Sequence, residues 1–213
     1  MVTADDLRRV FATRVGAPSF VEAEGNVRGS AVLAPFYEES GDLWAVFTRR
    51  AWTLRAHTGE VSFPGGGVDE GEAFVDAALR EAQEEIALDP ASVEVLGELD
   101  HLMTVTSRSF IVPFVGLVAG GRPSLVASPG EVDAVLQVPV AELLQDDVFR
   151  EELWTFDVPP QWAPPDVARL GGPIERSIFF FELDGDTLWG ATAAMLRHLL
   201  SLALGLDVGI DHV

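Results

Sequence analysis

Residues 66–88 read GGVDEGEAFVDAALREAQEEIAL, and this stretch contains the clearest structural pattern in the chain. Its apolar residues recur at intervals of four, at Phe74, Ala78, Ala82 and Ile86. That spacing predicts an amphipathic helix over residues 72–86 with these side chains on its buried face. Three consecutive glycines, at positions 65 to 67, precede the helix and let the backbone approach a ligand closely.

The same predicted helix gathers three carboxylates on one face. Glu81, Glu84 and Glu85 stand at positions i, i+3 and i+4, so their side chains are neighbours. Like charges at this spacing repel, and an isolated helix gains nothing from them. A hard divalent cation reverses that argument, because Mg²⁺ takes oxygen ligands and recruits substrate phosphates. The pattern therefore indicates either a metal site or an ordinary solvated acidic face.

The spacing of the charged residues and the glycine resembles the Nudix box. The matching positions are Gly66, Glu72, Arg80, Glu81, Glu84 and Glu85. One position departs from the family pattern, since Ala87 stands where the family has Gly; this affects the turn at the helix end and leaves the expected ligands intact. The resemblance implies a hydrolase that uses Mg²⁺ or Mn²⁺ to split a pyrophosphate linkage. It also implies an α/β (α+β) fold, an α-β-α sandwich around a mixed sheet.

The resemblance also suggests roles for individual residues. Glu81 and Glu85 are the expected metal ligands, with Glu84 sharing the site. Arg80 stands four residues before Glu84, where it can hold that carboxylate in position, and Glu72 is expected to act with it. Two candidates remain open for the base that activates water. One is Glu84, and the other is Glu131, which is otherwise an ordinary acid in a turn.

The segment upstream of the box, residues 46–66, resembles a narrower signature, that of the Nudix coenzyme A pyrophosphatases. The matching positions are Thr48, Arg50, Ala51, Arg55, Gly59, Phe63, Pro64, Gly65 and Gly66. Residues 189–193, WGATA, are similar to the closing helix of that group. The resemblance implies cleavage of coenzyme A, with its disulfide and thioesters as further candidates, to 3′,5′-ADP and 4′-phosphopantetheine. ADP-ribose, another nucleoside diphosphate derivative, or a non-catalytic nucleotide-binding role are the alternatives.

A local basic cluster in this signature suits a substrate with several phosphate groups. We expect Gly65 and Gly66 to admit the substrate beside these basic side chains, which are Arg49, Arg50, Arg55 and His57. Each Arg could instead pair with a surface carboxylate such as Glu60. His57 could order the loop or fill a polar pocket rather than bind phosphate, and Trp52 could pack in the core, pack within the loop, or stack against a base.

Composition narrows the classes of partner. The formal net charge is −20, from 34 acidic and 14 basic residues, and every one of those basic residues is Arg. Such a surface opposes nucleic acid and anionic lipid, so we expect a small-molecule substrate met by local Arg residues or a metal. Cysteine is absent, which excludes disulfides and a thiol nucleophile. Neither a signal-peptide layout nor an apolar run of roughly 18 residues is found, so we expect a soluble cytoplasmic protein. Composition says nothing of its oligomeric state.

The remaining pattern predicts a layered domain of mixed strands and helices spanning residues 1–213. Helices are expected at 5–14, 139–144 and 190–204, and strands at 30–36, 43–48, 93–102, 110–118, 132–138 and 177–183. Turn residues at 38–42 predict a hairpin between the first two strands. Residues 49–64 are expected to form a functional loop that passes into a short strand. The Pro- and Gly-rich stretch 157–173 is expected to be an ordered loop or lid.

Overall fold

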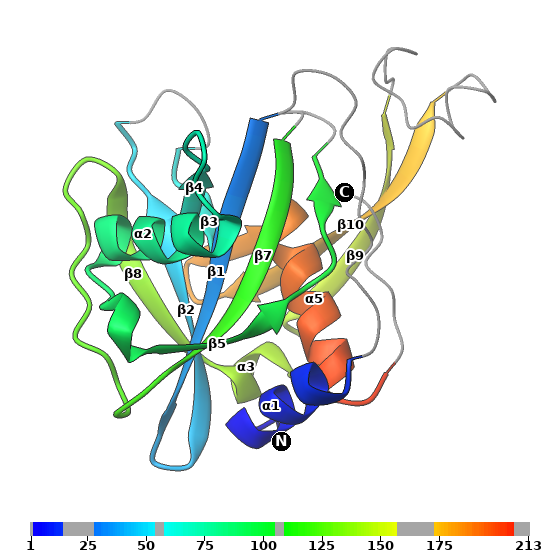
Figure 1. The fold of residues 1–213 in the computed structure, drawn as a ribbon. Helices are drawn as coiled ribbons and strands as arrows, with labels where there is room; N and C mark the ends of the chain where they lie inside the picture. The colour runs from blue at the N-terminus through cyan, green and yellow to red at the C-terminus, as the bar shows by residue number, and fades with distance from the viewer. Residues whose placement is uncertain (1, 15–27, 54–57, 105–108, 157–172, 207–213) are drawn as a thin grey trace.

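The computed structural model describes residues 2–14, 28–53, 58–104, 109–156 and 173–206 (Figure 1). The helices of this part are α1 (Ala4–Thr13), α2 (Phe74–Ile86), the 3₁₀ turn η1 (Pro90–Ser92), α3 (Val140–Leu143) and α5 (Gly190–Ala203). The strands are β1 (Arg28–Glu39), β2 (Asp42–Arg50), β3 (Val61–Ser62), β4 (Gly65–Gly67), β5 (Val93–Glu98), β6 (Leu102–Met103), β7 (Ser109–Val118), β8 (Val132–Pro139), β9 (Phe149–Phe156), β10 (Ile174–Leu183) and β11 (Asp186–Trp189).

The described strands form one hydrogen-bonded mixed sheet. Its main path runs β5-β7-β1-β2-β3-β11-β10-β9, while β4, β6 and β8 pair with β1, β7 and β2 respectively. The pairs β1–β7 and β11–β3 are parallel, whereas β1–β2, β2–β8 and β10–β9 are antiparallel. The sheet is therefore mixed, as the family resemblance implies.

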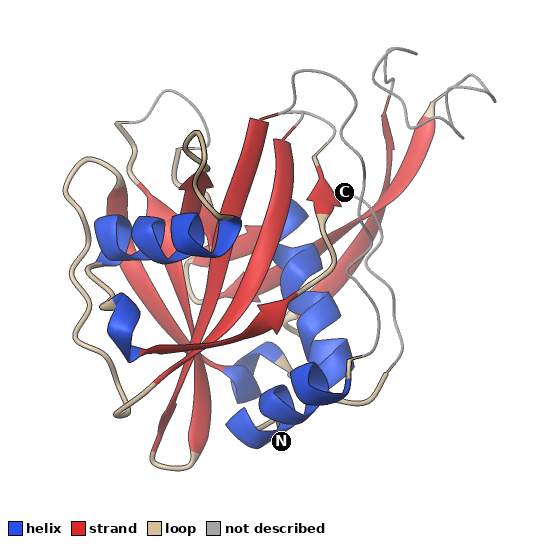
Figure 2. Ribbon diagram, in the orientation of Figure 1, coloured by secondary structure: helices blue, strands red, loops and turns tan. Residues whose placement is uncertain are grey.

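Helices cover both faces of this sheet (Figure 2). On β1, Ala31 and Leu33 belong to the apolar cluster beneath α2, whereas Ala34 and Phe36 belong to the cluster shared with α1, α3 and α5. This alternation follows from the strand's period of two, which sends successive side chains to opposite faces. The predicted buried face of α2 is confirmed for Ala78, Ala82 and Ile86, and Phe74 packs against the same cluster half-buried. The α-β-α arrangement is confirmed.

Most predicted elements are present. The helices expected at 5–14, 72–86 and 190–204 are α1, α2 and α5, and the hairpin turn lies at Ser40 and Gly41, whose φ values are 56° and 90°. Two consecutive positive φ values match the twist that a two-residue hairpin loop requires. No helix within the described ranges is both long and apolar enough to cross a membrane. The predicted loop at 157–173 falls, except for its last residue, outside the described residues.

The strands differ from the predictions in two ways. The single strand expected at 93–102 is divided into β5, which ends at Glu98 and contains a register shift between Val95 and Gly97, and β6, which begins only at Leu102. Strands β4, β9 and β11 were not predicted. Residues 149 to 155 of β9 are all exposed and include Arg150 and two glutamates, so the strand lacks the polar–apolar alternation that marks a half-buried strand.

Glycine is required where β4 crosses β1. A Cβ atom added at Gly65 would lie 2.4 Å from the Ala31 carbonyl oxygen and 2.8 Å from Val32 Cα, both backbone atoms that cannot turn away. Gly67, two residues further along β4, has nothing within 4 Å of the same position. The approach of β4 to β1 therefore depends on Gly65 and not on Gly67.

We expect Gly65→Ala to lower the free energy of unfolding by about 1–3 kcal/mol, the usual effect of forcing a methyl group into packed structure. Gly67→Ala is the matched control and should be neutral or slightly stabilising, because alanine restricts the unfolded chain. Urea unfolding followed by circular dichroism measures both variants. Equal midpoints for the two would show that β4 does not need the close approach.

Candidate active site

Arg80 lies on α2 and contacts three glutamates, Glu72, Glu81 and Glu84. Its Nε and Nη2 donate to the two Glu72 carboxylate oxygens, at 2.8 and 3.1 Å. Its Nη1 donates to Glu81 at 2.9 Å and to Glu84 at 3.2 Å. The bond from Arg80, with one from the Asp69 amide, holds the pKa of Glu72 below its usual range. Arg80 and Glu72 thus join the loop before α2 to the acidic face of the helix.

Gly66 provides the space that Glu81 occupies. A Cβ atom at position 66 would lie 2.4 to 2.5 Å from the three carboxylate atoms of Glu81, which is closer than any real contact. The Glu81 carboxylate therefore lies directly against the β4 backbone. A side chain at position 66 would therefore displace the Glu81 carboxylate from this place.

Glu85 is the buried member of the acidic group. Its side chain is 6% exposed, its Oε2 accepts a 3.3 Å hydrogen bond from the Gly65 amide, and its Oε1 lies 3.9 Å from Arg50 Nη1. Burial raises the pKa of Glu85 to about 7; the Gly65 bond and the charge of Arg50 lower it, and Glu81 and Glu131 raise it further. The site thus places a carboxylate where its charge has few compensating groups.

The segment that follows β7 closes over the end of α2. The amides of Val126 and Ser128 donate to the Ile86 and Glu85 carbonyl oxygens at 3.0 and 2.8 Å, which satisfies carbonyls that a helix end leaves unpaired. The carbonyl of Glu131 accepts from the Ala51 amide at 2.9 Å. These amide contacts were not predicted from the sequence, because backbone groups leave no signal in residue types. They attach residue 131 to the segment that also contains Arg50.

Ala87 ends the helix in the left-handed conformation, at φ 55° and ψ 30°. Glycine adopts this conformation without strain, whereas an L-residue with a Cβ incurs roughly 1–2 kcal/mol. The departure from the family pattern noted in the sequence is thus a local backbone strain beside the acidic site, and the helix still ends at Ile86.

The two adjacent arginines at the end of β2 have different partners. Arg50 faces Glu85, as given above. Arg49 lies 3.2 Å from Asp133 and 3.3 Å from Asp186, so it forms the carboxylate pairs that the sequence left open as an alternative to phosphate binding. Arg55 and His57, the other predicted substrate residues, lie outside the described residues.

The carboxylate oxygens of Glu81, Glu84 and Glu85 suit a hard divalent cation, although the three carboxylates do not converge on one point. Within the ranges that the structure describes, no three His, Cys, Asp or Glu side chains form a ready-made metal cluster. The reason is visible in the contacts: Glu81 and Glu84 are paired with Arg80, and Glu85 is bound to the Gly65 amide. The available ligands are nevertheless all carboxylate oxygens, the type that Mg²⁺ prefers, and the buried Glu85 lacks a strong counter-charge.

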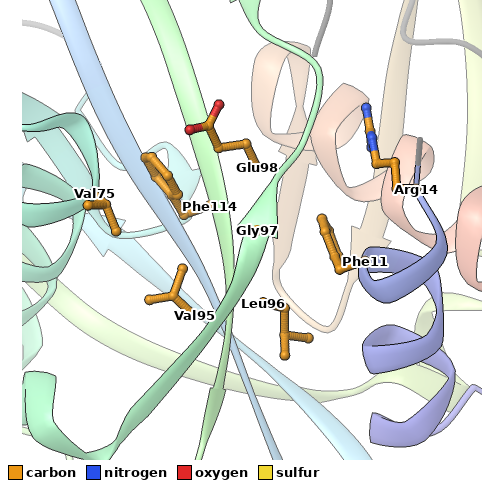
Figure 3. Close-up of a pocket in the computed structure, with 8 residues that line it drawn as sticks. All are labelled: Phe11, Arg14, Val75, Val95, Leu96, Gly97, Glu98 and Phe114. Atoms are coloured by element: carbon orange, nitrogen blue, oxygen red, sulfur yellow. The ribbon is translucent and has the colours of Figure 1, made fainter. Parts of the chain in front are cut away.

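A separate hollow lies near α1. It has a volume of about 450 Å³ and lies between α1, β5 and the first turn of α2, where Phe11, Val75 and Phe114 line it together with Arg14 and Glu98 (Figure 3). None of the glutamates of the acidic helix borders it. The predicted chemistry therefore does not belong to this hollow.

Comparisons with known proteins identify the family of this chain. Residues 27–157 match the family model of the NUDIX domain. The chain belongs to the Nudix hydrolase family. It is 35% identical over 183 residues to the uncharacterized Nudix hydrolase NudL of Cronobacter sakazakii, covering 85% of this chain and 86% of that one. The NudL protein of Salmonella paratyphi B is 37% identical over the same length, with the same coverage. A solved MutT/nudix family protein from Enterococcus faecalis has a TM-score of 0.48 at 14% identity, covering 97% of this chain and 88% of that one.

The raised pKa of Glu85 makes stability depend on pH when metal is removed. A carboxyl group with a raised folded-state pKa holds its proton more tightly in the folded protein, so it favours folding at low pH. That contribution is lost as the pH rises from 4.5, the unfolded value, through about 7. In EDTA at pH 8 we expect Glu85→Gln to be more stable than the wild type by roughly 2–4 kcal/mol, with the difference shrinking toward pH 4.5.

Urea unfolding at several pH values measures this difference. Glu70→Gln removes one exposed carboxylate from the loop before α2 and is the control for loss of surface charge. A gap between Glu85→Gln and wild type that stays constant from pH 5 to pH 8 would contradict the effect of burial.

Proposed function

We propose that this Nudix hydrolase is a Mg²⁺- or Mn²⁺-dependent pyrophosphohydrolase that cleaves coenzyme A to 3′,5′-ADP and 4′-phosphopantetheine. The observation that carries the proposal is the 3.9 Å approach of Arg50 to Glu85, since Arg50 belongs to the coenzyme A-type signature and Glu85 to the Nudix box. The two segments are brought together at one site. The hydrogen bond from the Gly65 amide to Glu85 joins them a second time.

Each residue of the site has a proposed role. Glu81, Glu85 and Glu84 would hold the cation, which when bound offsets the negative charge that develops on the pyrophosphate. Arg80, with Glu72, keeps Glu81 and Glu84 on one side of the helix. Gly65, which donates its amide to Glu85, and Gly66, which leaves space for the Glu81 carboxylate, would position these two ligands beside the substrate. Arg50, together with Arg55 and His57 of the same signature, would bind the phosphate groups.

In the reaction, a water oxygen attacks one phosphorus and the bond from that phosphorus to the bridging oxygen breaks. The proton of the water passes to a carboxylate, for which we propose Glu131. Two observations support this choice over Glu84: the charge of Glu131 contributes to the raised pKa of Glu85, and the exposed Glu131 side chain forms no ion pair with any residue that the structure describes. Glu84, in contrast, is already bound to Arg80.

We also propose that residues 1–213 form a single catalytic domain. Strands β10 and β11 lie beyond the matched family region, yet they continue its sheet through the β11–β3 and β10–β9 pairs. The ion pair between Arg49 and Asp186 adds a side-chain link between the same parts.

The substrate is tested by incubating the pure protein with coenzyme A, dephospho-coenzyme A, ADP-ribose, NADH and diadenosine polyphosphates, followed by chromatography of the products. Coenzyme A should be cleaved about tenfold to a hundredfold more efficiently than dephospho-coenzyme A, because a charge-assisted bond to the 3′-phosphate contributes roughly 1.5–3 kcal/mol. Equal efficiency would remove the 3′-phosphate from recognition. Faster cleavage of ADP-ribose than of coenzyme A would identify ADP-ribose as the preferred substrate.

A metal ligand and a general base should respond differently to neutralisation. Glu81→Gln removes a ligand oxygen, so we expect most of the rate to be lost at limiting Mg²⁺ and partly restored at high Mg²⁺. Glu131→Gln should lower kcat by about 10²–10⁴-fold, with Mg²⁺ dependence nearly unchanged and no rescue by metal. Initial rates over a Mg²⁺ series measure both.

Glu70→Gln is the control for these two variants, because Glu70 is exposed and lies outside the proposed machinery. Near wild-type turnover of Glu81→Gln at limiting Mg²⁺ would mean that Glu81 is not a ligand. A normal kcat for Glu131→Gln would return the base role to Glu84 or to a metal-bound hydroxide.

A further inference from the structure

Trp52 is an exposed aromatic side chain held in place by a glycine. It is 65% exposed, although it is a large hydrophobic side chain. A Cβ atom at Gly59, where φ is +71°, would lie 2.2 Å from Trp52 Cη2 and 2.5 and 2.6 Å from Cζ3 and Cζ2. Because this Cβ position is nearly equidistant from Cη2 and both of its ring neighbours, one face of the indole's six-membered ring lies over the Gly59 backbone. Of the roles that the sequence left open, packing in the core is wrong; the indole packs within the loop against Gly59, and stacking against a base stays open.

The backbone around Trp52 is fixed close to the acidic site. The amides of Arg50 and Ala51 donate to the carbonyls of Glu60 and Glu131, both at 2.9 Å, and the Gly59 amide donates to the Arg50 carbonyl at 3.1 Å. Trp52 follows Arg50 by two residues, or at most about 7 Å of extended chain. A planar group placed on Trp52 is thus within reach of a phosphate placed beside Arg50 and Glu85.

A stacking contact suits this protein because it does not depend on charge. The net charge of −20 opposes the approach of an anionic nucleotide. The π surface of an indole attracts a nucleobase without any ionic contribution, and every base presents such a face. An indole that packs one face on Gly59 and is still 65% exposed loses little freedom when a base covers its other face.

We propose that Trp52 is the surface on which the nucleobase of the substrate stacks, and that it thereby selects nucleotides over other pyrophosphates. The inference rests on the proposed function only in requiring a nucleoside diphosphate derivative as substrate. Trp52 touches the base and not the reacting atoms, so it contributes to substrate affinity rather than to the chemical step.

The test measures binding of adenosine 3′,5′-bisphosphate, AMP and inorganic pyrophosphate by calorimetry with Mg²⁺ present. Trp52→Ala should weaken binding of both adenine nucleotides about fivefold to a hundredfold, the range that loss of base stacking produces, and leave pyrophosphate binding unchanged. Trp52→Phe should restore most of the affinity. With the preferred substrate, Trp52→Ala should raise KM while kcat stays nearly constant.

Trp154→Ala is the matched control, because Trp154 is 38% exposed on β9 and has no proposed role at the site. Equal loss of nucleotide and pyrophosphate binding in Trp52→Ala would overturn the inference, since it would mean a distorted loop. So would unchanged nucleotide binding, or a shift of oligomeric state alone, which would assign Trp52 to a protein interface.

The same measurements distinguish failure of base stacking on Trp52 from failure of the proposal that coenzyme A is the substrate. A wild type that binds AMP as well as the bisphosphate, with both lost in Trp52→Ala, would refute 3′-phosphate recognition and support stacking. A wild type that binds pyrophosphate but neither nucleotide would refute stacking.

Discussion

The carboxylate of Glu85 is almost enclosed by protein, yet among the described residues the groups that compensate its charge are the Gly65 amide and a distant Arg50 guanidinium. Burying an ionised carboxylate without a close counter-charge costs several kcal/mol, and its pKa rises in response. Much of the surrounding structure can be understood as the set of groups that keep this carboxylate in place. A divalent cation would supply the missing charge, which explains why the chain tolerates an arrangement that is unfavourable without one.

The position of Glu85 depends in turn on how closely β4 approaches β1. Gly65 can donate its amide to Glu85 only because β4 lies against the backbone of β1 at Ala31 and Val32. On the other side of β4, Gly66 leaves the space that the Glu81 carboxylate fills. One short strand of glycines therefore sets the distance between the helix and the sheet.

Different arginines pair with different groups of carboxylates in this acidic chain. Arg80 holds Glu72, Glu81 and Glu84 together, and Arg49 joins β2 to Asp133 and Asp186 on other strands. Among the described residues, the Arg50 side chain forms one ion pair, a 3.9 Å approach to Glu85, and its Nε has no hydrogen-bond partner, so donors are available for a phosphate. The two adjacent arginines of β2 thus have different functions, because Arg49 links strands and Arg50 faces the acidic site.

The sequence alone determined the helix, its acidic face and the need for glycines before it. Those features are encoded locally: the spacing of apolar residues at Ala78, Ala82 and Ile86 places Glu81 and Glu85 by helical geometry alone. Strand β9 escaped prediction because an exposed edge strand carries no alternation. Only the tertiary structure decided that Glu85 is buried and that Glu131 lies near it. It also decided that Arg49 pairs with Asp133 and Asp186 whereas Arg50 faces Glu85. These depend on contacts between segments far apart in the chain, and residue spacing holds no record of which distant backbone will pack against a given side chain.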